Sequence, residues 1–108
     1  MALVALIVAL APAGAIGDDR PKSQVKVRTL KPSGASGVVR SKDGHCERNR
    51  KIRFFRLEDF ISVKVQHTRT DSNGRWRIVR DLDPGSYFAK VDSAKGCRFD
   101  NSPIERLR

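Results

Sequence analysis

The sequence has few of the side chains on which catalysis depends. It holds two histidines and two cysteines, and aromatic residues make up 6% of the chain. It has no Gly-x-Ser-x-Gly segment, no glycine-rich phosphate loop, and no pair of cysteines or histidines at the spacing of a metal site. An enzyme needs a base, a nucleophile or a metal ion beside the reacting atom. We therefore expect no enzymatic activity, no cofactor and no bound metal.

Helical periodicity is also missing. Outside the N-terminal segment, no stretch of ten residues repeats apolar side chains every three to four positions. Apolar and polar residues alternate instead through residues 63–91, in three segments separated at residues 71–74 (Asp-Ser-Asn-Gly) and 83–85 (Asp-Pro-Gly). Asparagine and glycine tolerate a left-handed backbone, and proline fixes φ at the first central position of a turn. The pattern predicts a β-meander of three strands.

Short segments of the same kind lie on both sides of these three. Residues 34–41, the stretch that begins at Arg50, and residues 101–107 each read as a strand. The whole pattern predicts an all-β antiparallel sandwich of six to seven short strands. We expect its core to contain Val38, Ile52, Phe54, Val63, Val65, Trp76, Ile78, Tyr87 and Val91, with His67 on the same inward row.

The N-terminal segment is uncharged from residue 1 to residue 17. An apolar run is followed by Pro12 and by three small residues, Ala13-Gly14-Ala15, which is typical of a secretory signal cleaved after Ala15. No basic residue precedes the run, which leaves two alternatives open: a retained N-terminal anchor, or an apolar tail on a cytosolic protein. With export as the main interpretation, the protein belongs outside the cytoplasm, secreted or at the cell envelope.

Three regions follow from this pattern. Residues 1–15 are predicted as a signal peptide and residues 34–108 as the sandwich domain. Residues 16–33 are polar and contain proline, so they are predicted as a linker, although residues 25–30 would also suit an edge strand. At 108 residues, the chain has room for a single core.

The two cysteines, Cys46 and Cys97, are predicted to form a disulfide, because an even count behind an export signal is typical of one. Closing a loop of about 50 residues stabilises a small domain by about 4 kcal/mol in the chain-entropy model. The competing interpretation is a metal site of His45, Cys46, His67 and Cys97. Their spacing matches no known metal motif, so we favour the disulfide.

The chain is strongly basic, with 22 lysines and arginines against 12 acidic residues and a net charge of +10. Such a protein attracts anionic polymers through contacts that weaken with salt. The candidate binding residues, which we expect to form a basic stripe across one sheet, are Arg53, Lys64, Arg75, Arg77 and Lys90. Phe55 and Phe88 would add exposed rings. The alternative is that these cations only keep a small domain soluble.

Two segments carry a resemblance to a known family. They are residues 70–76 (Thr-Asp-Ser-Asn-Gly-Arg-Trp) and 82–89 (Leu-Asp-Pro-Gly-Ser-Tyr-Phe-Ala), to which residues 36–39 and the two cysteines add. Over residues 33–107 the chain resembles the carboxypeptidase regulatory-like domains, in particular small exported bacterial ones. These are immunoglobulin-like or prealbumin-like (transthyretin-like) β-sandwiches, related to the B-type repeats of bacterial adhesins. The resemblance implies a non-catalytic module.

The expected function is therefore a secreted, non-catalytic β-sandwich with a structural or binding role at the cell envelope or outside the cell. Its expected partner is an anionic envelope polymer, met through the basic surface, or another protein. Removal of the signal would leave no stable membrane span. The alternative is a basic β-domain that binds nucleic acid, against which the export signal argues.

Overall fold

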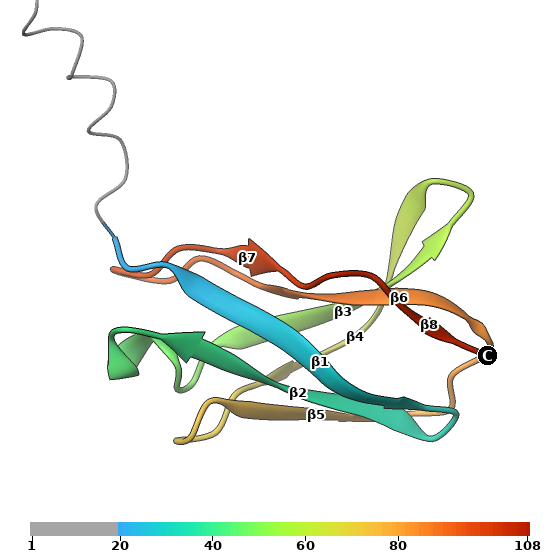
Figure 1. The fold of residues 1–108 in the computed structure, drawn as a ribbon, viewed down its shortest axis with the longest axis horizontal. Helices are drawn as coiled ribbons and strands as arrows, with labels where there is room; N and C mark the ends of the chain where they lie inside the picture. Colours follow the sequence, from blue (N-terminus) through green and yellow to red (C-terminus); the bar gives the residue numbers. More distant parts are fainter. Residues whose placement is uncertain (1–19) are drawn as a thin grey trace, which may run out of the picture.

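The structure is a computed structural model, and it describes residues 20–108. The predicted signal peptide, residues 1–15, lies outside the described residues. Within them, eight strands form two antiparallel sheets that pack face to face as a sandwich (Figure 1). The all-β sandwich is thus confirmed, with one or two strands more than expected. No helix in the described part has the length and apolar character that crossing a membrane requires.

The first sheet has three strands in the order β1-β2-β5: β1 (Ser23–Lys31), β2 (Gly34–Ser41) and β5 (Arg75–Val79). Within the predicted linker, residues 16–33, the structure forms β1, which pairs with β2 along its whole length. The alternative of an edge strand over residues 25–30 falls inside β1, at the edge of this sheet. A bulge at Arg28, between Val27 and Thr29, shifts the register. A bulge interrupts the alternation of inward and outward side chains, which is why the sequence favours a linker and offers the strand only as an alternative.

The second sheet has five strands. They are β3 (Lys51–Glu58), β4 (Ile61–Arg69), β6 (Gly85–Val91), β7 (Asp100–Asn101) and β8 (Glu105–Leu107), in the order β4-β3-β6-β7, with β8 also paired to β6. The last strand, predicted as one piece over residues 101–107, is divided in two at Pro103. Proline has no backbone N–H to donate to a neighbouring strand, so pairing stops there.

The three strands and two turns predicted over residues 63–91 are present, but the β-meander is wrong. β5 pairs with β2 in one sheet, whereas β6 pairs with β3 in the other. The chain therefore crosses between the two layers after β4 and again after β5. Alternation shows which side chains face inward, but it does not show which strand lies alongside, so the sequence could not distinguish a meander from this crossing.

Phe54 lies at the centre of the core. Its ring is 6.1 Å from that of Trp76 and stacks on that of Tyr87 at 5.3 Å, measured between centroids. Trp76 and Tyr87 are 3% and 1% exposed, as expected. The buried cluster comprises Val25, Ala35, Val39, Ile52, Phe54, Trp76, Ile78, Leu82, Tyr87, Ala89, Val91 and Leu107, with Val65 partly buried against it. Most of the predicted core is thus confirmed.

Three residues do not take their predicted places. Val63 is 44% exposed and lies opposite Arg56, in the exposed part of β4 next to the turn. His67 is exposed because a register shift between Phe54 and Phe55 changes the alternation along β4. After this shift His67 lies opposite Arg53, on the outer face of the sheet. Val38 is buried, but it lies outside the core cluster and opposite the outward residue Arg75.

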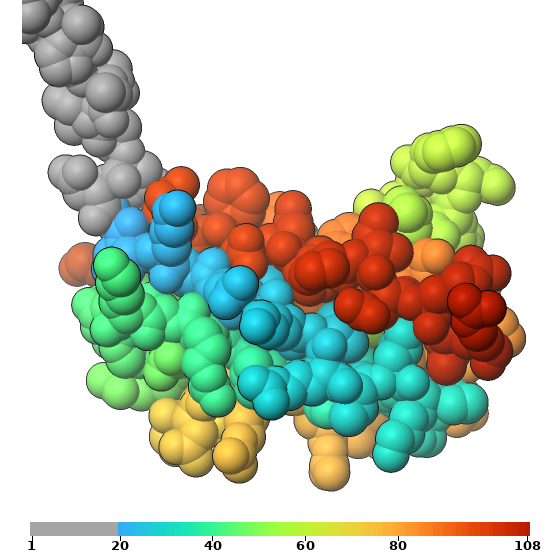
Figure 2. All heavy atoms as spheres, in the orientation of Figure 1, coloured from blue at the N-terminus to red at the C-terminus, as the bar shows by residue number. Residues whose placement is uncertain are grey.

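The β3–β4 hairpin extends beyond the body of the sandwich (Figures 1 and 2). Its turn residues Asp59 and Phe60 both have positive φ, of 46° and 67°. Phe60 is 98% exposed and Ile61 64% exposed. A bulky residue in the left-handed region is unusual, so the backbone of Phe60 is strained in this turn.

Two further features connect the segment between β2 and β3 to the segment between β6 and β7. The predicted disulfide is present, since Cys46 at the end of the short 3-10 helix η1 (Gly44–Cys46) is bonded to Cys97.

Beside the disulfide, Arg50 is 2% exposed, and its guanidinium donates to four oxygen atoms. These are Ser23 Oγ at 2.8 Å and the carbonyl oxygens of Cys46 at 2.6 Å, Asp92 at 2.7 Å and Arg98 at 3.0 Å. Burial lowers the pKa of Arg50, and Asp92 partly restores it.

Candidate anion-binding site

An open hollow of about 690 Å³ lies on the outer face of the three-stranded sheet, and the end of β4 closes one side of it. Its lining is dominated by arginine. The charged side chains that line it are Arg28, Arg40, Arg69, Arg75, Arg77 and one acid, Asp71. Five cations against one carboxylate make this the strongly basic part of the sheet surface.

The strand pleat brings these side chains to one face. In β5 the exposed Arg75 and Arg77 alternate with the buried Trp76 and Ile78. The sheet register then places Arg75 opposite Val38, and Arg77 opposite Ser36. Because successive residues of a strand point to opposite faces, the same alternation that fills the core also gathers the arginines outside it.

Three of the guanidinium groups are unpaired. Within residues 20–108, the side chains of Arg28, Arg75 and Arg77 make no hydrogen bond and no ion pair. The other two are engaged by the backbone: Arg40 Nη1 donates to the Asn73 carbonyl at 3.1 Å, and Arg69 Nη1 donates to the Asn49 carbonyl at 3.0 Å. Each guanidinium carries five N–H donors, so the three unpaired groups offer many donors to an anion.

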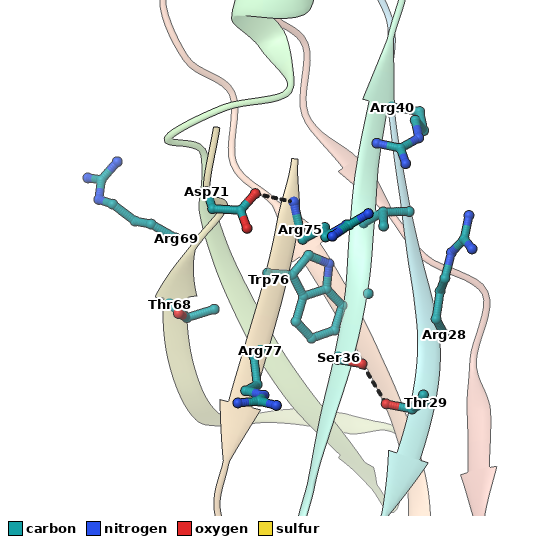
Figure 3. A pocket seen from close by; sticks show the side chains of 12 residues that line it. Arg28, Thr29, Ser36, Arg40, Thr68, Arg69, Asp71, Arg75, Trp76 and Arg77 are labelled. Carbon is teal, nitrogen blue, oxygen red and sulfur yellow. Dashed lines mark hydrogen bonds between the residues drawn. The ribbon is translucent and has the colours of Figure 1, made fainter. Parts of the chain in front are cut away.

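Small polar groups lie between the arginines. Thr29 Oγ1 and Ser36 Oγ are 2.5 Å apart across β1 and β2, and in the view of Figure 3 they lie between Arg28 and Arg77. One hydroxyl donates to the other in this bond, so the second keeps its O–H to donate to a ligand. Trp76 also lines the hollow, and its buried Nε1 has no hydrogen-bond partner in the described part of the chain.

The one carboxylate of the hollow is already engaged by its own turn. Asp71 Oδ1 accepts from the backbone N–H of Arg75 at 3.0 Å and of Asn73 at 2.8 Å. These bonds, that from Arg75 first, hold the pKa of Asp71 below its usual range. Asp71 also attracts the positive charge of Arg75, but one carboxylate among five guanidinium groups leaves the hollow strongly basic.

The basic stripe predicted across one sheet is divided between two sheets. Arg75 and Arg77 lie in the hollow, whereas Arg53, Lys64 and Lys90 belong to β3, β4 and β6 of the other sheet. The sequence did not indicate Arg28 and Arg40 as their companions. Arg28 lies on the strand that was taken for a linker, and only the pairing of β1 with β2 and β5 brings it to this face.

The outer face of the five-stranded sheet is more fully occupied. Arg53 forms an ion pair of 2.7 Å with Asp92 and lies over the Phe55 ring, 5.5 Å from its centroid. Phe55 and Phe88, predicted as exposed rings, are half-buried and stack on each other at 5.2 Å. Rings and cations that already contact one another have less surface to offer a ligand, so the hollow is the better candidate site.

The four-residue metal site considered from the sequence does not assemble. His67 lies on the outer face of β4, and the one group of possible metal ligands in the described residues consists of His45, Cys46 and Cys97. Two of these three are joined in the disulfide.

The hollow is therefore suited to bind a negatively charged group through several guanidinium groups at once. Its lining residues are arginines, hydroxyl residues and apolar residues, with a single aspartate. Comparison with known proteins gives no match: no family model fits the chain, and neither a curated protein nor a solved structure is significantly similar to it.

Proposed function

We propose that this protein is an exported, non-catalytic β-sandwich that binds an anionic polymer of the cell envelope through the arginine-lined hollow. The observation that carries the proposal is that Arg28, Arg75 and Arg77, from two different strands, reach one hollow and form no ion pair within residues 20–108. A net charge of +10 surrounds them. Long-range attraction then brings the polymer to the surface, and the hollow receives its charged groups.

Phosphate is the anion that fits this lining best. A guanidinium is planar and presents paired N–H donors that match two oxygens of a phosphate group. The hydrogen-bonded pair of Thr29 and Ser36 adds one free hydroxyl donor beside the arginines. The hollow is open to solvent and is lined from β1, β2, β4 and β5, so a charged group can enter it while the rest of a long chain stays outside, which favours a polymer over a small ligand.

Three further observations support a location outside the cytoplasm. The disulfide between Cys46 and Cys97 is of the kind that persists in oxidising compartments. The uncharged N-terminal sequence is typical of a secretory signal. The resemblance to small exported carboxypeptidase regulatory-like domains is consistent with that location, and with a binding module that has no catalytic role.

Binding to long-chain polyphosphate, measured over a range of salt concentrations, tests the proposal. The variant Arg28→Gln/Arg75→Gln/Arg77→Gln removes the three unpaired cations of the hollow. The matched control, Lys51→Gln/Lys64→Gln/Lys90→Gln, removes three cations from the other sheet and gives the same net charge. We expect the first variant to lose most of the affinity, and its salt slope to fall by about 2, since each contact contributes about 0.7 on a single-stranded polyanion.

Equal losses in the two variants would mean that affinity follows net charge alone, and would overturn the hollow as the site. Two other polymers extend the test. Polyglutamate carries carboxylates in place of phosphates, and double-stranded DNA represents the nucleic-acid alternative. A clear preference for DNA at matched salt would favour that alternative.

A further inference from the structure

His45 lies against the disulfide. Its Nε2 atom is 3.4 Å from Cys97 Sγ and 3.7 Å from Cys46 Sγ. The two cysteines are 0% and 1% exposed, whereas the side chain of His45 is 48% exposed. The imidazole therefore lies between solvent and a pair of buried sulfur atoms, and the three possible ligand atoms lie within 4.8 Å of one another.

The orientation of His45 is fixed by Asp43. The Asp43 side chain caps the helix η1 by accepting from the backbone N–H of His45 at 3.1 Å. The same Oδ1 atom is 2.6 Å from His45 Nδ1. An N–H on Nδ1 that donates to this carboxylate leaves the lone pair on Nε2, directed at the sulfur atoms. A carboxylate behind a histidine is the usual support of a histidine that binds a metal ion.

Gly96 lies beside the imidazole of His45. It has a φ of 76°, and a Cβ atom there would lie 3.4 Å from His45 Nε2. The left-handed φ favours glycine at this position, and an added Cβ would only reach van der Waals distance of the imidazole.

We propose that reduction of the Cys46–Cys97 disulfide creates a metal site, in which Cys46 Sγ, Cys97 Sγ and His45 Nε2 bind one thiophilic ion of the Zn²⁺ class. A thiol reductant supplies two electrons: two RSH become RSSR, and the disulfide becomes two Cys–SH groups. The ion then displaces one proton from each thiol as the two metal–sulfur bonds form. The disulfide and the metal are alternative occupants of the same three residues.

The dimensions suit this exchange. Zn²⁺ binds sulfur at about 2.3 Å and nitrogen at about 2.0 Å, so one ion can bridge three atoms as close as these. The sulfur atoms must separate by roughly 2 Å once their bond is broken. Cys46 ends a single-turn helix and Cys97 belongs to an isolated bridge with Ala94, so neither cysteine is held inside a long strand. The fourth position of a tetrahedral ion would face the exposed side of His45.

Cobalt serves as the probe, because Co²⁺ takes the same tetrahedral sites as Zn²⁺ and is visible in the absorption spectrum. The whole protein is reduced with a phosphine, freed of reductant without oxygen, and titrated with Co²⁺. We expect a thiolate-to-cobalt charge-transfer band in the reduced protein and none in the oxidised protein. Added Zn²⁺ should remove the band by displacement.

Variants identify the ligands. His45→Gln should weaken Co²⁺ binding at least tenfold while the thiolate band remains at high Co²⁺, and Asp43→Asn should weaken it by about tenfold or more. His67→Gln, which changes the exposed histidine of β4, should bind like the parent. Equal affinity in His45→Gln and the parent would overturn the proposal, as would the absence of a thiolate band in the reduced parent.

The reduced protein could also unfold, and near-ultraviolet circular dichroism of Trp76 reports this. If it does, addition of Zn²⁺ should restore the signal in the parent and in His67→Gln, but not in His45→Gln. Failure of Zn²⁺ to restore the fold of the parent would count against the site as firmly as a missing absorption band.

Discussion

The indole ring of Trp76 lies against the backbone of Gly37, and a Cβ atom at residue 37 would come within 2.5 Å of the ring atom Cζ2. The two residues are direct partners in the pairing of β2 with β5. The same Cβ would be 1.9 Å from the Lys26 carbonyl oxygen of β1. Gly37 therefore allows three strands to approach one another with a tryptophan between the layers, directly beneath the arginine-lined hollow.

Gly37→Ala should destabilise the protein by about 2–3 kcal/mol, because the added methyl group meets backbone as well as the tryptophan ring, and neither can move far. Urea unfolding followed by Trp76 fluorescence measures the change. Gly44→Ala is the control: the nearest atom to a Cβ there is 3.8 Å away, so its free energy of unfolding should stay within about 0.5 kcal/mol of the parent.

Arg50→Met should destabilise by at least about 3 kcal/mol, since it leaves four buried acceptors without their donor. Arg50→Lys should recover only part of this loss, because one ammonium group cannot reach acceptors on both sides as a guanidinium does. Lys51→Met, at the next and exposed position, should be close to neutral. An Arg50→Met protein as stable as Lys51→Met would contradict the role given to the buried guanidinium.

Acid should weaken the turn at residues 71–74. The pKa of Asp71 is lowered in the folded protein by its bonds from Arg75 and Asn73, so its contribution is present above the ordinary aspartate pKa of about 4. It is lost as pH falls from there through the lowered folded value. Asp71→Asn should therefore flatten the acid side of a stability profile measured by urea unfolding. Asp81→Asn, at an exposed position, should keep the slope of the parent.

Phe60→Gly should stabilise the protein by about 1 kcal/mol, although it removes an aromatic ring. The ring is 98% exposed, so little burial is lost, and glycine adopts the φ of 67° without a steric penalty. Thermal unfolding measures the gain. Phe60→Ala, which loses the ring but keeps the Cβ atom, should gain much less, and an equal gain in both variants would refute the explanation from backbone strain.

The sequence predicted the segments in which apolar and polar residues alternate regularly, and missed the places where that alternation is interrupted. Trp76, Ile78, Tyr87 and Val91 lie in unbroken alternations, and all are buried as expected. The strand β1 was predicted only as an alternative to a linker, because a bulge at Arg28 interrupts its alternation. Alternation also carries no information about strand partners, which is why the crossing of the chain between the layers was not foreseen.

The candidate site was predicted only in part, because alternation shows which side chains point outward but not which strands lie in one sheet. Arg75 and Arg77 lie in a regular strand, and their outward direction was readable from their buried neighbours. Their grouping with Arg53, Lys64 and Lys90 assumed one continuous sheet, whereas the structure has two. His45 beside the disulfide depends on the fold of a short loop, and no periodic signal describes that.

β4 is the outermost strand of its sheet, with one side free of any strand neighbour in the described structure. Arg80, from the connection between β5 and β6, reaches across and donates to the Val65 carbonyl oxygen at 2.7 Å. A second molecule that tried to add its own strand here would have to break that bond and bring another ten positive charges alongside. This edge of the five-stranded sheet is thus protected against pairing with a second copy of the chain.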